Sequence, residues 1–259
     1  NRQPIRPTPV GEKVILRARE VLEQAESIKD IILEEQKSMQ GTFRLGILPT
    51  IAPYLLPRFF PQLMKKYPAL DIRVKEMKTH EIKAALLQGD IDAGILAAID
   101  GLEEYAQTSL FYERYVGYVS REDPLYARES IRTADVASSG QLWLLDEGHC
   151  FRDQMVRFCQ MKASQSSQLA YGLGSMETFM RMVESGMGIT FIPELASLQL
   201  NDSQKELVRP FAIPVPTREL VLLTNRNFIR QTLLNVLVSE IQACIPKNML
   251  KLNAGQALV

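Results

Sequence analysis

The sequence predicts an α/β fold, because short apolar runs alternate with amphipathic stretches from Phe43 onward. The apolar runs have the length and composition of strands. We expect strands over 43–48, 72–77, 93–96, 116–119, 142–145, 189–192 and 220–223. Helices are expected between them, for example over 53–66, 80–88 and 176–184. This alternation is typical of parallel sheets with crossover helices.

A long amphipathic helix is predicted before the α/β region, within residues 1–40. Thr8 and Pro9 are a suitable N-cap and first-turn pair, and Gly41 is expected to end the helix. Apolar residues recur at alternating steps of three and four, a heptad pattern that only Glu35 interrupts. They are Val14, Ala18, Val21, Ala25, Ile28, Ile32 and Met39. We expect this face to pair with a second copy of the chain; the alternative is an amphipathic helix packed on its own domain.

Composition limits the classes of protein to which the chain can belong. The 259 residues, 46% hydrophobic and 23% charged, are enough for two domains with buried cores. Because 30 basic residues balance 30 acidic ones, any DNA contact must be local or lie outside this chain. No run of about 18 apolar residues and no signal-peptide pattern is found. We therefore expect a cytoplasmic protein with no membrane partner.

The most informative segment contains two cysteines nine residues apart. Cys150 opens a predicted helix, follows His149 and precedes Arg152, and these cations and the helix N-terminus favour a thiolate. We expect a pKa for the Cys150 thiol in the range of about 3.5 to 7.5 seen for activated thiols. Cys159 supplies a second thiol with which a sulfenic acid on Cys150 can condense to a disulfide.

The spacing of the two cysteines carries a geometric prediction. In one continuous helix, nine residues separate the two Cα atoms by about 13 to 14 Å. A disulfide tolerates a Cα separation of at most about 7 Å. A helical reduced state and a disulfide-bonded state therefore cannot share one backbone, and oxidation must unwind or refold this segment.

The spacing alone leaves other interpretations of the cysteines open. Two cysteines in a cytosolic protein are often inert, buried side chains. A structural zinc site usually needs four ligands, whereas this chain has three cysteines, two histidines and no CxxC pair. We expect no metal and no cofactor. Cys244, in an apolar helical stretch, is expected to have no role.

The cysteine segment resembles the redox region of the OxyR-type peroxide sensors, a branch of the LysR-type transcriptional regulators. The shared features are Gly148-His149-Cys150, Arg152-Asp153-Gln154 and Phe158-Cys159. The stretches 87–95 and 184–193 resemble recurrent signatures of the wider family. The resemblance implies that hydrogen peroxide oxidises Cys150 and that Cys159 closes the disulfide.

The resemblance also implies a periplasmic-binding-protein-like fold, with two Rossmann-like subdomains joined by two crossover strands and preceded by a long linker helix. Residues 1–40 are expected to form the linker and dimerisation helix. The first subdomain would take 41–115 and 217–259, and the second, with the redox segment, 116–216. The crossover strands are expected near 111–118 and 209–217.

Two threonines are candidates for binding the peroxide. Thr50 and Thr79 each follow a predicted strand, and ligands in open α/β sheets bind at the C-terminal ends of strands. Each can equally be an N-cap of the helix that follows. The family places both threonines and His149 around the peroxide.

Three supporting residues complete the expected site: Arg152, Asp153 and Arg218. Asp153 is expected either to join the polar network or to act only as a first-turn helix charge. Arg218 corresponds by resemblance to an arginine that supports the thiolate.

The leading hypothesis is a redox-sensing regulatory domain that controls oxidative-stress genes and is not an enzyme. The implied partners are hydrogen peroxide, DNA through an N-terminal winged helix-turn-helix absent from this chain, a dimer or tetramer of the chain, and a thiol reductant such as glutaredoxin or thioredoxin. The alternatives are a LysR-type sensor of a small organic effector, a thiol peroxidase and a solute-binding protein. A peroxidase would turn over with a reductant, whereas a sensor reacts stoichiometrically.

Overall fold

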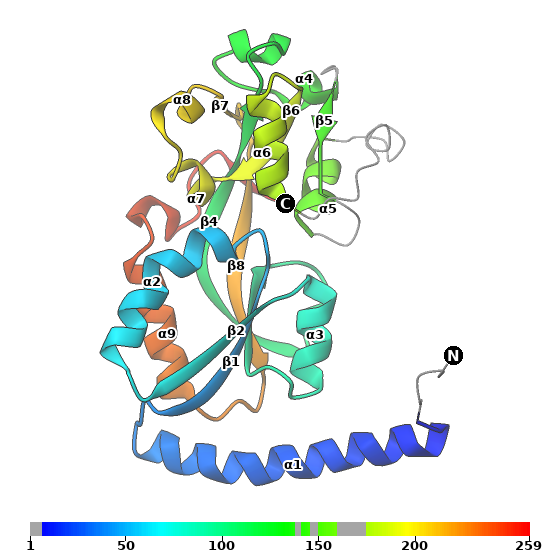
Figure 1. Cartoon of the computed structure of the whole chain (residues 1–259), viewed down its shortest axis with the longest axis vertical. Helices are drawn as coiled ribbons and strands as arrows, with labels where there is room; N and C mark the ends of the chain where they lie inside the picture. The colour runs from blue at the N-terminus through cyan, green and yellow to red at the C-terminus, as the bar shows by residue number, and fades with distance from the viewer. Residues whose placement is uncertain (1–6, 138–140, 146–149, 160–174) are drawn as a thin grey trace.

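The computed structural model describes residues 7–137, 141–145, 150–159 and 175–259. Two lobes lie one above the other, with a long helix crossing beneath the lower one (Figure 1). We call the lower part, built around strands β1 to β3, lobe I, and the upper part, built around β5 to β7, lobe II.

The first helix, α1 (Pro9–Glu35), begins where the sequence predicts and ends earlier. The Thr8 side chain accepts a hydrogen bond from the Gly11 amide at 3.1 Å, as expected of an N-cap. The helix stops at Glu35 because Lys37 adopts a left-handed backbone with φ of 48°. Gly41, the predicted end, instead opens the first strand.

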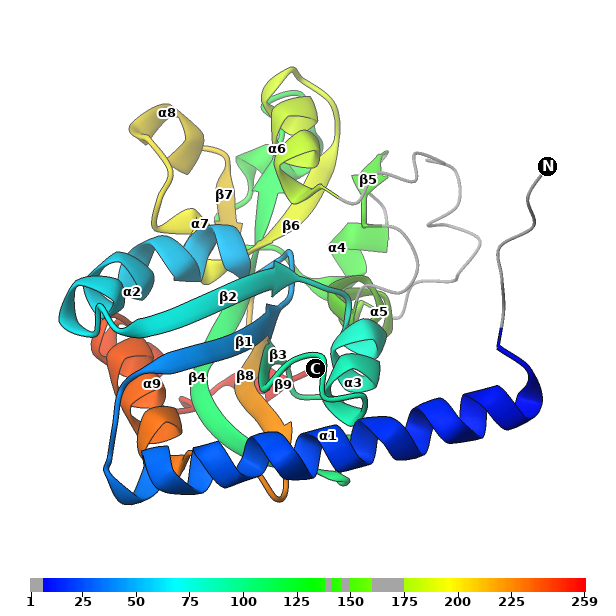
Figure 2. The ribbon, with the colours of Figure 1, turned by 60° about the horizontal axis from the view of Figure 1, so that its bottom comes forward.

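Lobe I is an α/β unit with the predicted parallel strands. Its sheet contains β1 (Gly41–Ile47), β2 (Leu70–Glu76) and β3 (Ala93–Ala97). β1 lies between the other two and runs parallel to both. The helices are α2 (Ala52–Lys66), α3 (Thr79–Leu87) and α9 (Gln231–Ala243). α2 and α9 lie on one side of the sheet and α3 on the other (Figures 1 and 2).

Two long strands pass from one lobe to the other. β4 (Tyr105–Val119) pairs antiparallel with β8 (Val215–Asn225) in lobe I and with β6 (Ile189–Pro193) in lobe II. The crossing strands therefore make the sheet mixed, whereas the alternation along the sequence predicts parallel sheets only. Within the described residues the strand order is β2-β1-β3-β8-β4-β6-β5.

The second crossover differs from the continuous strand expected over 209–217. It is divided into β7 (Val208–Pro210), which pairs with β4, and the start of β8 at Val215. The Ile213–Pro214 peptide between them is cis. Prolines lack the amide donor that a continuous ladder requires, so the strand is interrupted.

Lobe II carries the redox segment on a short helix. Its remaining strand, β5, is Leu142–Trp143, which is shorter than the expected 142–145. Its α-helices are α4 (Thr133–Ala137), α5 (Cys150–Phe158), α6 (Met176–Glu184), α7 (Glu194–Ser197) and α8 (Asp202–Lys205). Two short 3₁₀ turns (Pro124–Ala127 and Lys247–Met249) and strand β9 (Gln256–Leu258) complete the described elements.

One glycine in lobe II makes a close approach that no other residue allows. Gly188 has a φ of +64°, and a Cβ added to it would lie 2.3 Å from the Gln141 carbonyl oxygen. That same oxygen accepts the Ile189 amide at 2.9 Å, which joins β5 to β6. The β5–β6 pairing therefore depends on the absence of a side chain at position 188.

We expect Gly188→Ala to lower the free energy of unfolding by more than the roughly 1 to 3 kcal/mol of a left-handed non-glycine residue, because a backbone clash adds to the strain. Chemical denaturation measures the loss. Gly101→Ala is the matched control: its φ is +81°, but the nearest atom, Lys83 Nζ, is 3.5 Å away. Equal losses in the two variants would contradict the proposed clash.

Candidate functional site

Cys150 is buried at the junction of the two lobes. It is the first residue of α5, and only 8% of its surface is exposed. The Thr79 hydroxyl at the start of α3 and the Arg218 guanidinium on β8 both act on its sulfur. Helices α3 and α5 meet at this junction (Figure 2). The local sequence places Cys150 at a helix start, but three separate elements build its surroundings.

The centre of the junction is a buried ion pair between the two crossing strands. Glu113 on β4 and Arg218 on β8 are directly opposite in the antiparallel ladder. Arg218 Nε and Nη2 donate to Glu113 Oε2 at 2.9 and 2.7 Å, and both side chains are almost fully buried, at 0% and 1%. Glu113 Oε1 also accepts the Leu195 amide of lobe II at 2.9 Å. The pair therefore connects the two crossing strands to α7.

Arg218 also holds the predicted Thr50. Its Nη1 donates to Thr50 Oγ1 at 3.1 Å, and its Nη2 donates to the Thr50 carbonyl at 3.2 Å. Because Thr50 Oγ1 accepts this bond, its own hydroxyl hydrogen is available to a further acceptor. The predicted Thr50 and Arg218 are thus in direct contact.

Aromatic side chains form a wall beside the guanidinium. The Tyr115 and Phe151 rings pack edge to face with centroids 4.8 Å apart. The Arg218 guanidinium carbon lies 5.6 Å from the Tyr115 centroid and 5.8 Å from that of Phe151. Such an apolar wall lowers the local dielectric and strengthens the electrostatic interactions within the site.

The predicted low pKa of Cys150 is wrong for this state of the protein. Burial is the largest influence and raises the pKa of the Cys150 thiol above its ordinary value, although the Thr79 hydroxyl and the Arg218 charge lower it. The prediction considered neighbours in sequence, whereas desolvation depends on packing. Cys150 is therefore a resting thiol surrounded by groups that favour the thiolate.

The Thr79 hydroxyl is ready to act on a charged species. It is buried and has no hydrogen-bond partner of good geometry among the described atoms, yet its position near the sulfur lowers the pKa of Cys150. A buried hydroxyl without a full partner costs free energy. The site thus contains a donor that gains a strong bond when negative charge appears on the sulfur or on a bound molecule.

Cys159 lies at the far end of the same helix. Its amide donates to the Met155 carbonyl at 3.0 Å, so the helical bonding continues from Cys150 through Cys159. Both thiols are free and buried. The predicted helical state of this segment is confirmed, and ideal helix geometry then separates the two Cα atoms by about 13 to 14 Å. Burial alone raises the pKa of Cys159 to about 12.

Comparison with known proteins agrees with this arrangement. Residues 36–244 match the LysR substrate-binding domain family. A hydrogen peroxide-inducible genes activator of Dickeya chrysanthemi is 32% identical over 215 residues, which is 83% of this chain and 70% of that protein. The chain belongs to the OxyR branch of the LysR-type regulators.

Solved structures of OxyR proteins share the fold. The crystal structure of OxyR from Porphyromonas gingivalis is 51% identical, with a TM-score of 0.78 over 85% of this chain and 99% of that one. The oxidised form of an OxyR protein is 32% identical, with a TM-score of 0.68 over 81% of this chain and 98% of that one. The expected periplasmic-binding-protein-like architecture is consistent with this OxyR fold.

The remaining residues singled out in this OxyR-type domain are not among the buried groups described around Cys150. Arg152 is half-buried on α5, and Asp153 is exposed, with a charge that raises the pKa of Cys150. His149 lies outside the described residues. Cys244 is half-buried, and its Sγ is 3.0 Å from the Ile241 carbonyl.

Sequence reasoning did not identify Glu113, Tyr115 or Gln154 as parts of the site. Gln154 belongs to the Arg152-Asp153-Gln154 run, so the motif contained a signal for it. Glu113 and Tyr115 lie in a strand with no motif, and only a buried charge within an apolar stretch could have drawn attention to Glu113.

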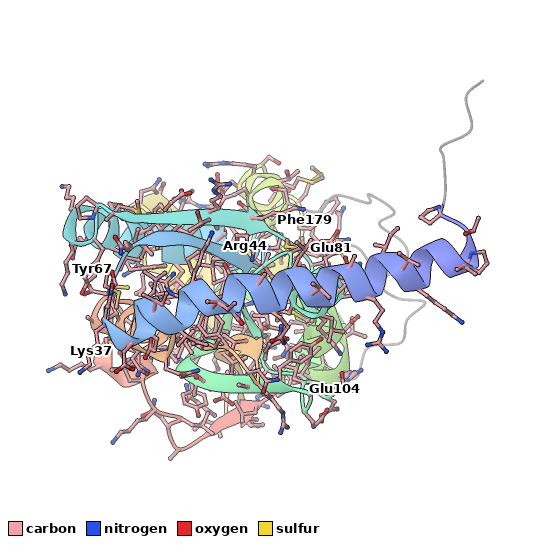
Figure 3. The ribbon with its side chains drawn as sticks, turned by 90° about the horizontal axis from the view of Figure 1, so that it is seen from below. Lys37, Arg44, Tyr67, Glu81, Glu104 and Phe179 are labelled. Carbon is pink, nitrogen blue, oxygen red and sulfur yellow. The ribbon has the colours of Figure 1, made fainter. Side chains whose placement is uncertain are left out.

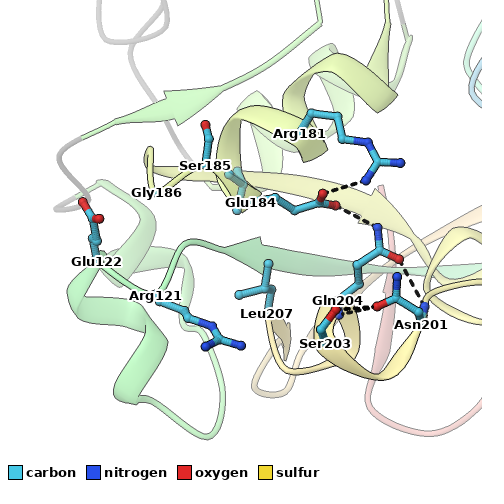
Figure 4. Close-up of a pocket in the computed structure, with 11 residues that line it drawn as sticks. Arg121, Glu122, Arg181, Glu184, Ser185, Gly186, Asn201, Ser203, Gln204 and Leu207 are labelled. Carbon is cyan, nitrogen blue, oxygen red and sulfur yellow. Dashed lines mark hydrogen bonds and ion pairs between the residues drawn. The ribbon is translucent and has the colours of Figure 1, made fainter.

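Two cavities of the OxyR-type domain lie away from the cysteines. One of about 490 Å³ in lobe II is lined by Arg121, Arg181, Glu184 and Gln204, and hydrogen bonds and ion pairs link most of these charged groups to partners (Figure 4). The other, of about 500 Å³, lies between α1 and lobe I, near the labelled Arg44 (Figure 3). Neither is lined by Cys150.

The described part of the chain lacks two further kinds of feature. No group of three His, Cys, Asp or Glu side chains there is arranged to hold a metal ion. No helix among them is both long and apolar enough to span a bilayer.

Because the thiolate is the reactive form, we expect alkylation of Cys150 to accelerate as the pH rises through a pKa above the ordinary value of about 8.5. Thr79→Val should shift this profile to still higher pH without lowering the free energy of unfolding, since the lost hydroxyl has no full partner. Mass spectrometry of the Cys150 peptide gives the profile.

Thr190→Val is the matched control for Thr79→Val. The buried Thr190 hydroxyl donates to the Trp143 carbonyl at 2.9 Å. Its loss should reduce the free energy of unfolding by about 1 kcal/mol and leave the Cys150 profile unchanged. An unshifted profile in Thr79→Val would show that this hydroxyl does not act on the sulfur.

Proposed function

We propose that this domain senses hydrogen peroxide through Cys150 and passes the signal on by a disulfide with Cys159. The observation that carries the proposal is a buried thiol on which Arg218 and Thr79 act, with Thr50 bonded to that arginine and a second thiol at the other end of the same helix. The relative from Dickeya, a hydrogen peroxide-inducible genes activator, supports peroxide as the oxidant.

The first step oxidises Cys150 and reduces the peroxide. The thiolate sulfur attacks one peroxide oxygen, an S–O bond forms and the O–O bond breaks. The leaving hydroxide takes the proton released from the thiol and departs as water. Arg218, Thr50 and Thr79 would donate hydrogen bonds to the developing charge, which is how preorganised donors accelerate a reaction. By resemblance His149 joins them.

The second step joins the two sulfurs. Cys159 attacks the sulfenic acid of Cys150, an S–S bond forms, the S–O bond breaks, and water leaves. In the intact helix Cys159 is both too distant and, with its raised pKa, a poor nucleophile. Unwinding of α5 would bring Cys159 closer and remove the burial that suppresses its ionisation.

The same proposal assigns roles to the parts of the chain. Residues 41–115 with 217–259 would form one regulatory subdomain and 116–216 the other, and residues 1–40 the linker. Arg152 and Asp153 would support the site from the surface of α5. A cytoplasmic thiol reductant such as glutaredoxin or thioredoxin would reset the disulfide, and a winged helix-turn-helix outside these 259 residues would bind DNA.

The linker helix α1 supports self-association. Among its described side chains several apolar ones are largely exposed: Val10, Val14, Val21, Leu22, Ile28, Ile31 and Ile32. Its C-terminal end is fixed to lobe I, where Glu34 accepts the Thr232 hydroxyl at 2.7 Å and the Thr232 amide at 3.0 Å. An apolar stripe of this length favours pairing with a second copy of the helix.

We expect Cys150→Ser to abolish reaction with hydrogen peroxide, because it removes the attacking sulfur. Cys159→Ser should still react but remain as the sulfenic acid and proceed to sulfinic and sulfonic acid. Free-thiol counts and intact mass after one equivalent of peroxide distinguish these outcomes. Continued peroxide consumption beyond one equivalent, with reductant present, would favour a thiol peroxidase instead.

Oxidation of the native chain should raise backbone hydrogen exchange across α5, since a disulfide between its ends cannot form while the helix is intact. Cys244→Ser, which leaves both redox cysteines in place, is the control and should show the same change. A Cys150–Cys159 disulfide with unaltered exchange in α5 would refute the proposed switch.

We also expect Ile28→Glu to weaken self-association in sedimentation measurements, because it places a charge in the apolar stripe. Lys29→Glu, on an adjacent exposed position of the same helix, is the control for added negative charge and should have little effect. A chain that stays monomeric with or without residues 1–40 would contradict the role of the helix.

A further inference from the structure

Gln154 connects the redox helix to two other strands. It lies one turn after Cys150 on α5, and only 6% of its surface is exposed. Its Oε1 accepts the Tyr115 hydroxyl of β4 at 2.7 Å, and its Nε2 donates to the main-chain oxygen of Val259 at 2.7 Å. The C-terminal end of the described chain lies beside α5 in Figure 1. One buried amide therefore bridges segments that are far apart in sequence.

The bond to Tyr115 positions a wall of the thiol site. The Tyr115 ring packs against Phe151, the residue after Cys150, and lies under the Arg218 guanidinium. Tyr115 itself is fully buried. Gln154 thus fixes the second turn of α5 against the same ring that contacts Arg218.

The bond to Val259 lies at the end of a short strand. Among the described residues, β9 pairs with the 215–217 segment of β8, over three residue pairs. At the two ends of this pairing, the Val215 amide donates to the Gly255 carbonyl at 2.8 Å and the Val259 amide donates to the Thr217 carbonyl at 3.1 Å. Because the pairing is short, the buried amide of Gln154 adds a side-chain bond where β9 ends.

We propose that Gln154 is the positioning residue that latches α5 to β4 and to β9, so that β9 is released when the Cys150–Cys159 disulfide forms. The second half of this inference rests on the proposed function, because Gln154 lies inside the segment that the disulfide must unwind. Once α5 unwinds, the main-chain oxygen of Val259 loses its side-chain donor. The strand then detaches from the part of β8 that leads directly into Arg218.

The role of the two Gln154 hydrogen bonds can be tested in the reduced protein without any oxidant. Gln154→Met keeps the length and burial of the side chain and removes both hydrogen bonds. We expect amide exchange at Leu258 and Val259 to increase about tenfold, the effect of losing one buried hydrogen bond. The pH profile of Cys150 alkylation should also shift, because Tyr115 and α5 are no longer fixed against the site. A change in global stability alone would neither raise amide exchange specifically in β9 nor shift the pH profile of Cys150 alkylation.

Gln242→Met is the matched control. The Gln242 amide also donates to backbone carbonyls, at 3.3 Å to Ser109 and 3.1 Å to Leu110, and both of these acceptors lie on β4 rather than on α5 or β9. Exchange in β9 should be unchanged in this variant. Equal amide exchange of β9 in the native chain and in Gln154→Met would overturn the proposal that Gln154 holds β9.

The test of the oxidised state uses the native chain, so it does not depend on whether a variant folds. After treatment with one equivalent of hydrogen peroxide, exchange over 256–259 should rise together with that of α5. If the disulfide forms and β9 keeps its protection, the proposed release is wrong. If no disulfide forms, the proposed function fails, and the comparison of reduced native and Gln154→Met chains still decides whether Gln154 holds β9.

Discussion

The buried ion pair between Arg218 and Glu113 is the interaction on which the rest of the junction depends. Removing two charges from water is costly, and the cost is offset only when geometry and additional hydrogen bonds are good. Here both conditions hold: Arg218 makes two bonds to Glu113 and two to Thr50, and Glu113 accepts the Leu195 amide. Loss of one partner would leave an uncompensated charge, so the guanidinium is held in one place.

In the proposed function, a fixed guanidinium would explain how a buried cysteine reacts. Burial favours the neutral thiol, so Cys150 rests in its protonated form. The surrounding donors are arranged for charge that appears during reaction: Thr79 has an unsatisfied hydroxyl, and Thr50 has a hydroxyl hydrogen to give. In the proposed function, these donors would stabilise the negative charge that develops on the peroxide during the reaction.

Site and switch are built on the same nine-residue helix. Cys150 begins α5, Gln154 ties its second turn to β4 and β9, and Cys159 follows its end. Since the two sulfurs cannot meet while the helix persists, the proposed disulfide would change the contacts of Gln154 in the middle of the helix. Gln154 bonds to Tyr115 of β4, and β4 pairs with strands of both lobes and carries Glu113 of the ion pair. In the proposed function, packing alone would therefore couple a local oxidation to the junction.

The sequence by itself determined most elements and the geometry of the switch. Hydrophobic periodicity predicted β1, β3 and β6 to within two residues at each end, and the Cys150-to-Cys159 spacing predicted that a helical segment could not also carry the disulfide. These properties are local, and the backbone geometry of a helix or strand follows from a few neighbouring residues. Tertiary structure decided the rest. Glu113 meets Arg218 only because two strands more than 100 residues apart align in register, and Gln154 meets Val259 only because α5 packs beside β9. The pKa of Cys150 follows the same rule: its neighbours in sequence favour a thiolate, but desolvation by residues distant in sequence reverses the sign, because burial is a property of the folded core.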